Sequence, residues 1–138
     1  MPTRMLLLGL GIVAVVVAGV VVAQPVQKAG GVEVLEGTWQ GTVMVRATNA
    51  RVGVTTKIEK DGRFVSEPSG AGRWISKGVF QGQDGKFTFE ATTTNPDNRS
   101  APVAESSGTA TLEVSAGKET LTVISATTGN TATYQRGK

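Results

Sequence analysis

Apolar and polar residues alternate with a period of two along most of the chain after position 36. The first run places Trp39, Gly41 and Val43 on one face of an extended segment. Later runs repeat this pattern, which is typical of β-strands with one buried face and one exposed face. Eight strands are predicted, at 37–46, 51–59, 63–67, 73–80, 87–92, 109–114, 120–124 and 131–136.

Short turn sequences separate most of these runs. Asp61-Gly62 predicts a two-residue hairpin of type I′, because that turn needs positive φ at both central residues. Strands joined by hairpins form an antiparallel meander, and eight of them can close into a barrel without exposed edges. The predicted fold class is therefore all-β, an eight-stranded antiparallel up-and-down barrel over 36–138. A β-sandwich is the alternative.

The start of the chain has a different pattern. Arg4 precedes an uninterrupted apolar run at 5–23, and the run ends in small residues followed by Gln24-Pro25. This is the pattern of a secretory signal peptide, here residues 1–23. The run is also close to the roughly 20 residues that span a membrane, so an uncleaved signal anchor in the inner membrane is the alternative.

Under both interpretations, the remainder of the chain is exported to the periplasm or the extracellular space. An N-terminal signal helix is expected before the barrel, and contact with a membrane only if it stays uncleaved. Residues 24–35 are predicted to be a linker, because Pro25, Gly30 and Gly31 interrupt regular structure.

The chain contains neither histidine nor cysteine. This removes cysteine nucleophiles, Ser-His-Asp triads, histidine general bases and ordinary zinc sites. No two acidic residues stand in a context that suggests a catalytic pair. A protein without enzymatic activity, metal or cofactor is expected. Without disulfides, packing and strand pairing must hold the domain together.

Positive charge is concentrated in the first half of the barrel sequence. Seven basic and three acidic residues lie between positions 46 and 77, in a chain of net charge +3. Two interpretations are open: a solubilising surface, or a basic face for an anionic partner. No cluster of aromatic and basic residues suited to nucleic acid is present, so a nucleic-acid partner is not expected. The candidate basic face consists of Arg46, Arg51, Lys57 and Arg63.

Gly37-Thr38-Trp39 resembles the G-x-W motif that opens the first strand of lipocalins and related calycin barrels. The resemblance implies that Trp39 plugs one end of the barrel and that a basic residue of the last strand packs across it. Arg136 occupies that position in the last predicted strand. A cation over an indole face is favourable by roughly 0.5–2 kcal/mol. The chain lacks the C-terminal helix of typical lipocalins, and its few aromatics do not imply a biotin site of the avidin type.

Two functions are compatible with this sequence. One is a binding protein that holds a small apolar or amphipathic ligand inside the barrel. The alternative is a structural or interaction module of the cell envelope, which binds an envelope component through the basic face. The same aromatic side chains would fill the core if there were no cavity, and the oligomeric state is left open. The candidate ligand-pocket residues are Trp39, Trp74, Phe87, Phe89 and Tyr134.

Overall fold

A computed structural model describes residues 26–70, 73–96 and 103–136. The predicted signal helix, and with it the cleavage junction, lies outside the described residues. Within them no α-helix occurs, and no helix is long and apolar enough to cross a membrane. The elements are β1 (Val26–Gln27), the 3₁₀ helix η1 (Val32–Leu35), β2 (Gly37–Val45), β3 (Ala50–Ile58), β4 (Arg63–Pro68), β5 (Ile75–Gln83), β6 (Lys86–Thr94), β7 (Ala104–Ser115), β8 (Lys118–Ser125) and β9 (Thr131–Arg136).

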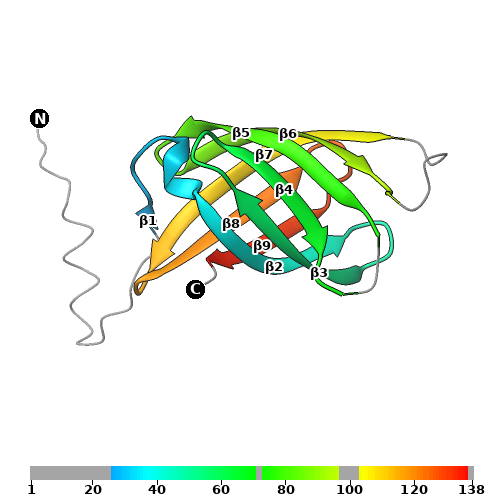
Figure 1. Cartoon of the computed structure of the whole chain (residues 1–138). Helices are drawn as coiled ribbons and strands as arrows, with labels where there is room; N and C mark the ends of the chain where they lie inside the picture. Colours follow the sequence, from blue (N-terminus) through cyan, green and yellow to red (C-terminus); the bar gives the residue numbers. More distant parts are fainter. Residues whose placement is uncertain (1–25, 71–72, 97–102, 137–138) are drawn as a thin grey trace, which may run out of the picture.

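Strands β2 to β9 form a closed antiparallel barrel, in which each strand pairs with the next one along the chain. The barrel closes because β9 also pairs with β2, with Trp39 opposite Arg136. The tilted strands wrap around into a closed barrel, as Figure 1 shows, and the buried apolar side chains form one core inside it. The predicted all-β, eight-stranded antiparallel barrel is confirmed, and the alternative of a sandwich is wrong because no sheet edge is left between β2 and β9.

Residues 26–35, the described part of the expected linker 24–35, are structured instead. β1 adds a short ninth strand beside β7, and η1 follows it at the same end of the barrel (Figure 1). Leu35 at the end of η1 is completely buried. The glycines near position 30 break the chain into short elements, but they do not keep it off the barrel, because Leu35 covers apolar side chains of the core.

The hairpins β5–β6 and β7–β8, at the same end of the barrel as η1, have tight turns. Asp84-Gly85 and Ala116-Gly117 both have two residues at positive φ, as a two-residue turn of type I′ requires. The prediction of a type I′ turn at Asp61-Gly62 is wrong, since only Gly62 of these two residues has a positive φ. There the Gly62 amide instead donates to the carbonyl of Glu59, which makes a longer hairpin loop.

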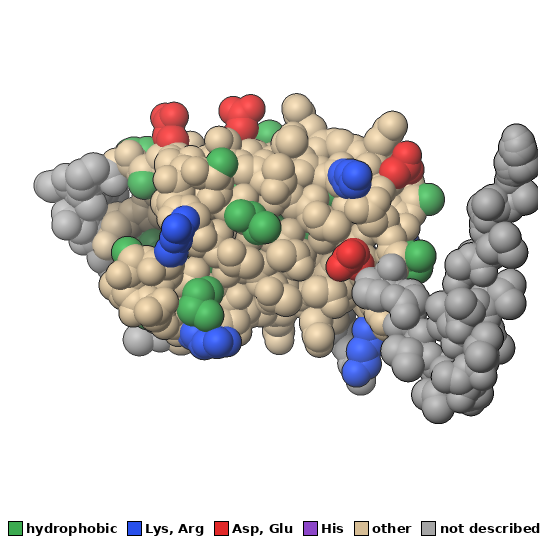
Figure 2. Space-filling model, turned by 180° about the vertical axis from the view of Figure 1, so that it is seen from behind, with side chains coloured by type: hydrophobic (Ala, Val, Ile, Leu, Met, Phe, Trp, Pro, Cys, Tyr) green, Lys and Arg blue, Asp and Glu red, His purple; other side chains and the backbone are tan. Residues whose placement is uncertain are grey.

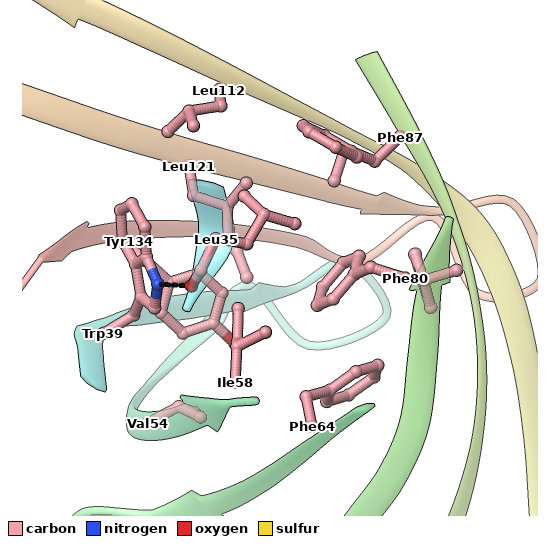
Figure 3. Close-up of a cluster of buried hydrophobic side chains, with 13 residues drawn as sticks. Leu35, Trp39, Val54, Ile58, Phe64, Phe80, Phe87, Leu112, Leu121 and Tyr134 are labelled. Carbon is pink, nitrogen blue, oxygen red and sulfur yellow. Dashed lines mark hydrogen bonds between the residues drawn. The ribbon is translucent and has the colours of Figure 1, made fainter. Parts of the chain in front are cut away.

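Apolar side chains fill the half of the barrel next to η1, which we call the closed end. Trp39, Leu112 and Leu121 are completely buried there, and Figure 3 shows them pointing into the same interior space. The opposite end, which we call the open end, carries the connections β2–β3, β4–β5, β6–β7 and β8–β9. Because each strand alternates between inward and outward residues, the predicted inward face of β2 is the face that meets the core.

Candidate functional site

A cavity of about 420 Å³ occupies the interior of the barrel toward the open end. Trp74, just before β5, and Asn130, just before β9, lie at its mouth together with Glu105 at the start of β7. Proteins bind small molecules in pockets of about 300–1,000 Å³ that are mostly apolar with a few polar groups. The cavity has the size and the position of a ligand site.

Apolar side chains form two of the cavity walls. On one side Phe64, Phe80 and Phe89 make an aromatic wall, with ring centroids 4.6 Å apart for Phe64–Phe80 and 6.0 Å apart for Phe80–Phe89. On the other side β8 and its neighbours contribute aliphatic groups, among them Leu121 and Val123. Such walls favour an apolar guest, because contact with it removes apolar surface from water.

A row of hydroxyl groups runs across β3 to β6, on the side of the barrel that carries the aromatic wall. Thr56 on β3 is directly opposite Ser66 on β4, Ser66 is opposite Ser76 on β5, and Ser76 is opposite Thr93 on β6. All four residues line the cavity. The hydroxyls of Thr56 and Ser66 hydrogen-bond to each other at 2.6 Å, and those of Ser76 and Thr93 also pair. The cavity therefore has one polar stripe in an otherwise largely apolar lining.

Tyr134 lies beside the deeper of these two pairs. It comes from β9, on the other side of β2, and its phenol is near the hydroxyls of Thr56 and Ser66. The residue opposite Tyr134 on β2 is Gly41, which has no side chain to stand between the tyrosine and β3. Burial raises the pKa of the Tyr134 phenol, although the neighbouring hydroxyls of Thr56 and Ser66 act in the opposite direction. The phenol is therefore protonated at neutral pH and has a proton to donate.

At the closed end, the guanidinium of Arg136 lies over the Trp39 indole, with its carbon 4.3 Å from the ring centroid. The Trp39 indole N–H donates to the carbonyl of Leu35 at 2.8 Å, the bond drawn in Figure 3. Arg136 donates to the carbonyl of Val34 at 2.6 Å and to that of Glu36. These bonds fasten η1 across the end of the barrel, because they satisfy carbonyls that the short helix leaves without partners.

The structure explains why the G-x-W motif has a glycine at position 37. Gly37 has φ of 136°, which L-amino acids with a side chain rarely adopt. A Cβ atom there would stand 2.8 Å from a terminal nitrogen of Arg136. Gly37 thus leaves space for the guanidinium that covers Trp39.

Glu119 on β8 completes the closed end with an ion triad. Its carboxylate accepts from Arg136 Nε at 2.7 Å and from Lys28 Nζ at 2.7 Å. Hydrogen bonding from Arg136, supported by Lys28, lowers the pKa of the Glu119 carboxyl against the opposing effect of partial burial. The triad joins β8 and β9 to the segment that enters from β1.

This geometry predicts an acid-sensitive contribution to stability. A carboxyl whose pKa is lower in the folded state stabilises the fold above its unfolded pKa, and this contribution is lost as pH falls through the folded value. In urea titrations, Glu119→Gln is expected to lower the unfolding free energy by about 1–3 kcal/mol at pH 7. The difference from wild type should shrink as pH drops below about 4.3, the ordinary pKa of glutamate.

The matched control for this titration is Glu90→Gln, since Glu90 is exposed on the outer surface of β6. The unfolding free energy of Glu90→Gln should equal that of wild type at all pH values. If the gap between wild type and Glu119→Gln stayed constant from pH 7 to pH 3, Glu119 would not be the titrating group.

The structure separates the five candidate pocket residues into two groups. Trp74, Phe89 and Tyr134 line the cavity. Trp39 and Phe87 do not, because both are buried in the packed core toward the closed end. Phe64, Phe80 and the hydroxyl row were missed in the sequence. Thr56 lies in the predicted strand 51–59, but its partners become visible only when the strand register is known.

The basic residues are spread over the surface rather than gathered. Arg46 and Arg51 lie at the open end, whereas Lys57 and Arg63 lie toward the closed end of neighbouring strands. Arg63 pairs with Asp61 at 2.8 Å and with Glu59 at 3.4 Å. On the face seen in Figure 2, single basic and acidic side chains are likewise scattered among uncharged ones.

The chemistry available in the cavity is hydrogen bonding and apolar contact. Its hydroxyls have no imidazole or thiol beside them, because the sequence has no histidine or cysteine. Among residues 26–70, 73–96 and 103–136, no group of three or more acidic residues is placed to hold a metal ion. The described lining can hold and orient a molecule.

The fold and cavity define a class: a small, closed, eight-stranded antiparallel barrel with a cavity inside, compatible with a lipocalin-like fold. No protein-family model, curated protein or solved structure matches this chain. The cavity is therefore the feature from which a function can be inferred.

Proposed function

We propose that this protein binds one small apolar or amphipathic molecule inside the barrel, in the manner of a lipocalin-like carrier or sensor. The observation that carries this proposal is the cavity of about 420 Å³, with its aromatic and aliphatic walls. Burying an apolar guest there would gain roughly 25 cal/mol for each Å² of apolar surface removed from water.

The division of the interior into two halves supports this proposal. An eight-stranded barrel is just wide enough for its own side chains to fill it, or for it to hold one small ligand. Here Trp39, Leu35 and Leu112 fill the closed end, while the open end contains smaller residues such as Ala91 and Ala132 around the cavity. A core selected only for stability would have filled this volume, because a void costs packing energy.

We further propose that the protein works after export, in the periplasm or outside the cell, or anchored in the inner membrane if residues 5–23 are retained. The support is the apolar run itself, which lies outside the described residues. Binding of this kind needs no catalytic group, metal or cofactor. The alternative function, an interaction module with a basic face, has less support because Arg46, Arg51, Lys57 and Arg63 are spread between the two ends of the barrel.

A cavity-filling substitution tests binding. Val123 lines the cavity between the small residues Ala110 and Ala132 on the neighbouring strands, whereas Ile124 points outward and is 46% exposed. Nile red, a neutral dye that brightens in apolar surroundings, is expected to bind wild type and Ile124→Phe alike. Val123→Phe should bind at least about tenfold more weakly, a loss that corresponds to roughly 1.4 kcal/mol.

Circular dichroism and thermal unfolding would establish that both variants are folded. Equal dye binding by Val123→Phe and Ile124→Phe would place the dye outside the cavity and contradict the proposal. Native mass spectrometry of protein purified from its own host is the complementary search for a resident ligand.

A further inference from the structure

The inward side chains of β5 and β6 change in kind between the closed end and the open end. Phe80 lies opposite Phe89, and Ser76 lies opposite Thr93 nearer the open end. Each of the two hydroxyl residues is four positions from the phenylalanine of its own strand, and four positions span about 13 Å of extended chain. On β6 the small residue Ala91 lies between them and also lines the cavity. This wall therefore presents aromatic surface at its inner end and hydroxyl groups near the mouth.

The hydroxyl pair near the mouth can bind a polar group of a guest. Ser76 and Thr93 are partly buried and line the cavity, and their hydroxyls hydrogen-bond to each other. A hydroxyl has one proton to donate and two lone pairs to accept. The bond between the two hydroxyls uses one of their two protons, so the pair keeps one proton and several lone pairs. It can therefore serve a guest group that donates or one that accepts.

The deeper hydroxyl pair is a less favourable place for such a group. Thr56 and Ser66 are buried, with 2% and 6% of their surface exposed. A polar group that reached them would give up its contact with water, which is costly unless its hydrogen bonds are replaced. At Ser76 and Thr93 the group could bind to the protein and keep part of its hydration. The polar end of a guest is therefore expected at the pair near the mouth.

From these observations we infer that the ligand is an elongated amphipathic molecule with its polar group at one end. Ser76 and Thr93 hold the polar group near the mouth. The apolar body extends inward past Ala91 to the rings of Phe80 and Phe89. This inference rests on the proposed function, because it names the chemical class and the orientation of the molecule in that cavity. It also assigns Ser76 and Thr93 as residues that determine specificity.

Bromine at either end of a ten-carbon alcohol tests the orientation, because bromine quenches a tryptophan that it contacts. Trp74 lies at the mouth, two positions before Ser76. The measurement uses Trp39→Phe, in which Trp74 is the remaining tryptophan. At saturation, 2-bromo-1-decanol should quench emission, because its bromine is beside the hydroxyl. The isomer 10-bromo-1-decanol should also displace Nile red but leave emission nearly unchanged, because its bromine is at the inner end.

Removing both hydroxyls near the mouth tests the site of the polar group. The double variant Ser76→Ala, Thr93→Val should bind decanol about fivefold more weakly, for want of one neutral hydrogen bond. It should bind 1-bromodecane, which has no hydroxyl, as wild type does. In the Trp39→Phe background it should also let the two bromoalcohols quench Trp74 alike. Thr92→Val is the matched control, since Thr92 is exposed on the outer surface of β6, and it should behave as wild type.

The outcomes separate this inference from the proposed function. If 10-bromo-1-decanol quenched Trp74 as strongly as its isomer, or more strongly, the orientation would be wrong while binding in the cavity would stand. This test leaves the cavity lining unchanged, so it decides the inference even if the double variant does not fold. The inference would also be wrong if the folded double variant lost affinity for decanol and 1-bromodecane equally, or for neither. If Nile red itself bound wild type no better than Val123→Phe, the proposed function would fail, and this inference with it.

Discussion

Trp39→Ala is expected to lower the free energy of unfolding by about 3–5 kcal/mol, the range for removing a large aromatic side chain from a core. Trp39 is completely buried, supports η1 through its hydrogen bond to Leu35, and provides the surface on which Arg136 lies. Folded domains have unfolding free energies of about 5–15 kcal/mol, so this single change should remove a large part of the total.

Two further variants, Trp39→Phe and Trp74→Ala, are compared with Trp39→Ala by urea unfolding. Trp39→Phe keeps much of the ring but leaves the Leu35 carbonyl without its donor, so a loss of about 1–3 kcal/mol is expected. Trp74→Ala removes the same side chain from the half-buried mouth of the cavity and should cost less than Trp39→Ala. Equal losses at the two tryptophans would contradict the role of Trp39 as the plug of the closed end.

Arg136→Met is expected to have the second largest effect, a loss of about 2–4 kcal/mol in unfolding free energy. Methionine keeps an apolar chain over the indole but leaves Glu119 with Lys28 alone and removes donors from the carbonyls of Val34 and Glu36. Arg136→Lys should recover only part of this loss, because an ammonium group cannot stack and reach three acceptors at once.

The matched control for Arg136 is Arg63→Met. Arg63 also pairs with two carboxylates, but its side chain is 67% exposed, against 27% for Arg136. Surface pairs contribute little, so a change within about 0.5 kcal/mol is expected. Hydrogen exchange should show faster opening of residues 32–35 in Arg136→Met and not in Arg63→Met. Similar behaviour of the two variants would mean that Arg136 does not fasten η1.

Much of the barrel follows from local patterns in the sequence. Alternation places Trp39 and Val43 on the inner face of β2, and the hairpin signals give a meander that closes on itself. These predictions succeed because each depends on a period of two and on turns of a few residues. The pairing of Trp39 with Arg136 came from a resemblance, since no local pattern connects the first strand with the last.

The parts that were missed depend on contacts between distant segments. Residues 24–35 look like a linker because Gly30 and Gly31 interrupt local structure, yet Leu35 and the triad around Glu119 hold residues 26–35 on the barrel. The short run at 63–67 gave no reason to place Phe64 in the lining. The size of a cavity depends on side chains that face one another across the whole barrel, and the sequence alone does not give that geometry.

The hydroxyl row shows the same limit at the site. Thr56, Ser66, Ser76 and Thr93 belong to four different strands, and they become neighbours only through the register of three strand pairs. Each residue alone is ordinary for a strand or turn. A one-residue shift in any pair would turn one of these hydroxyls outward, so the polar stripe is a property of the complete barrel.

The barrel has a sealed end at Trp39 and a cavity that reaches Trp74, and we propose that this cavity holds the ligand. A dibromodecane with bromine at both ends tests it most directly, because bromine quenches the fluorescence of a tryptophan that it contacts. In Trp39→Phe, where Trp74 is the remaining tryptophan, the probe should quench emission in a saturable way, and Val123→Phe added to this background should abolish the effect. In Trp74→Phe, where only Trp39 emits, emission should be unchanged. Saturable quenching of Trp39, or none of Trp74, would contradict the account.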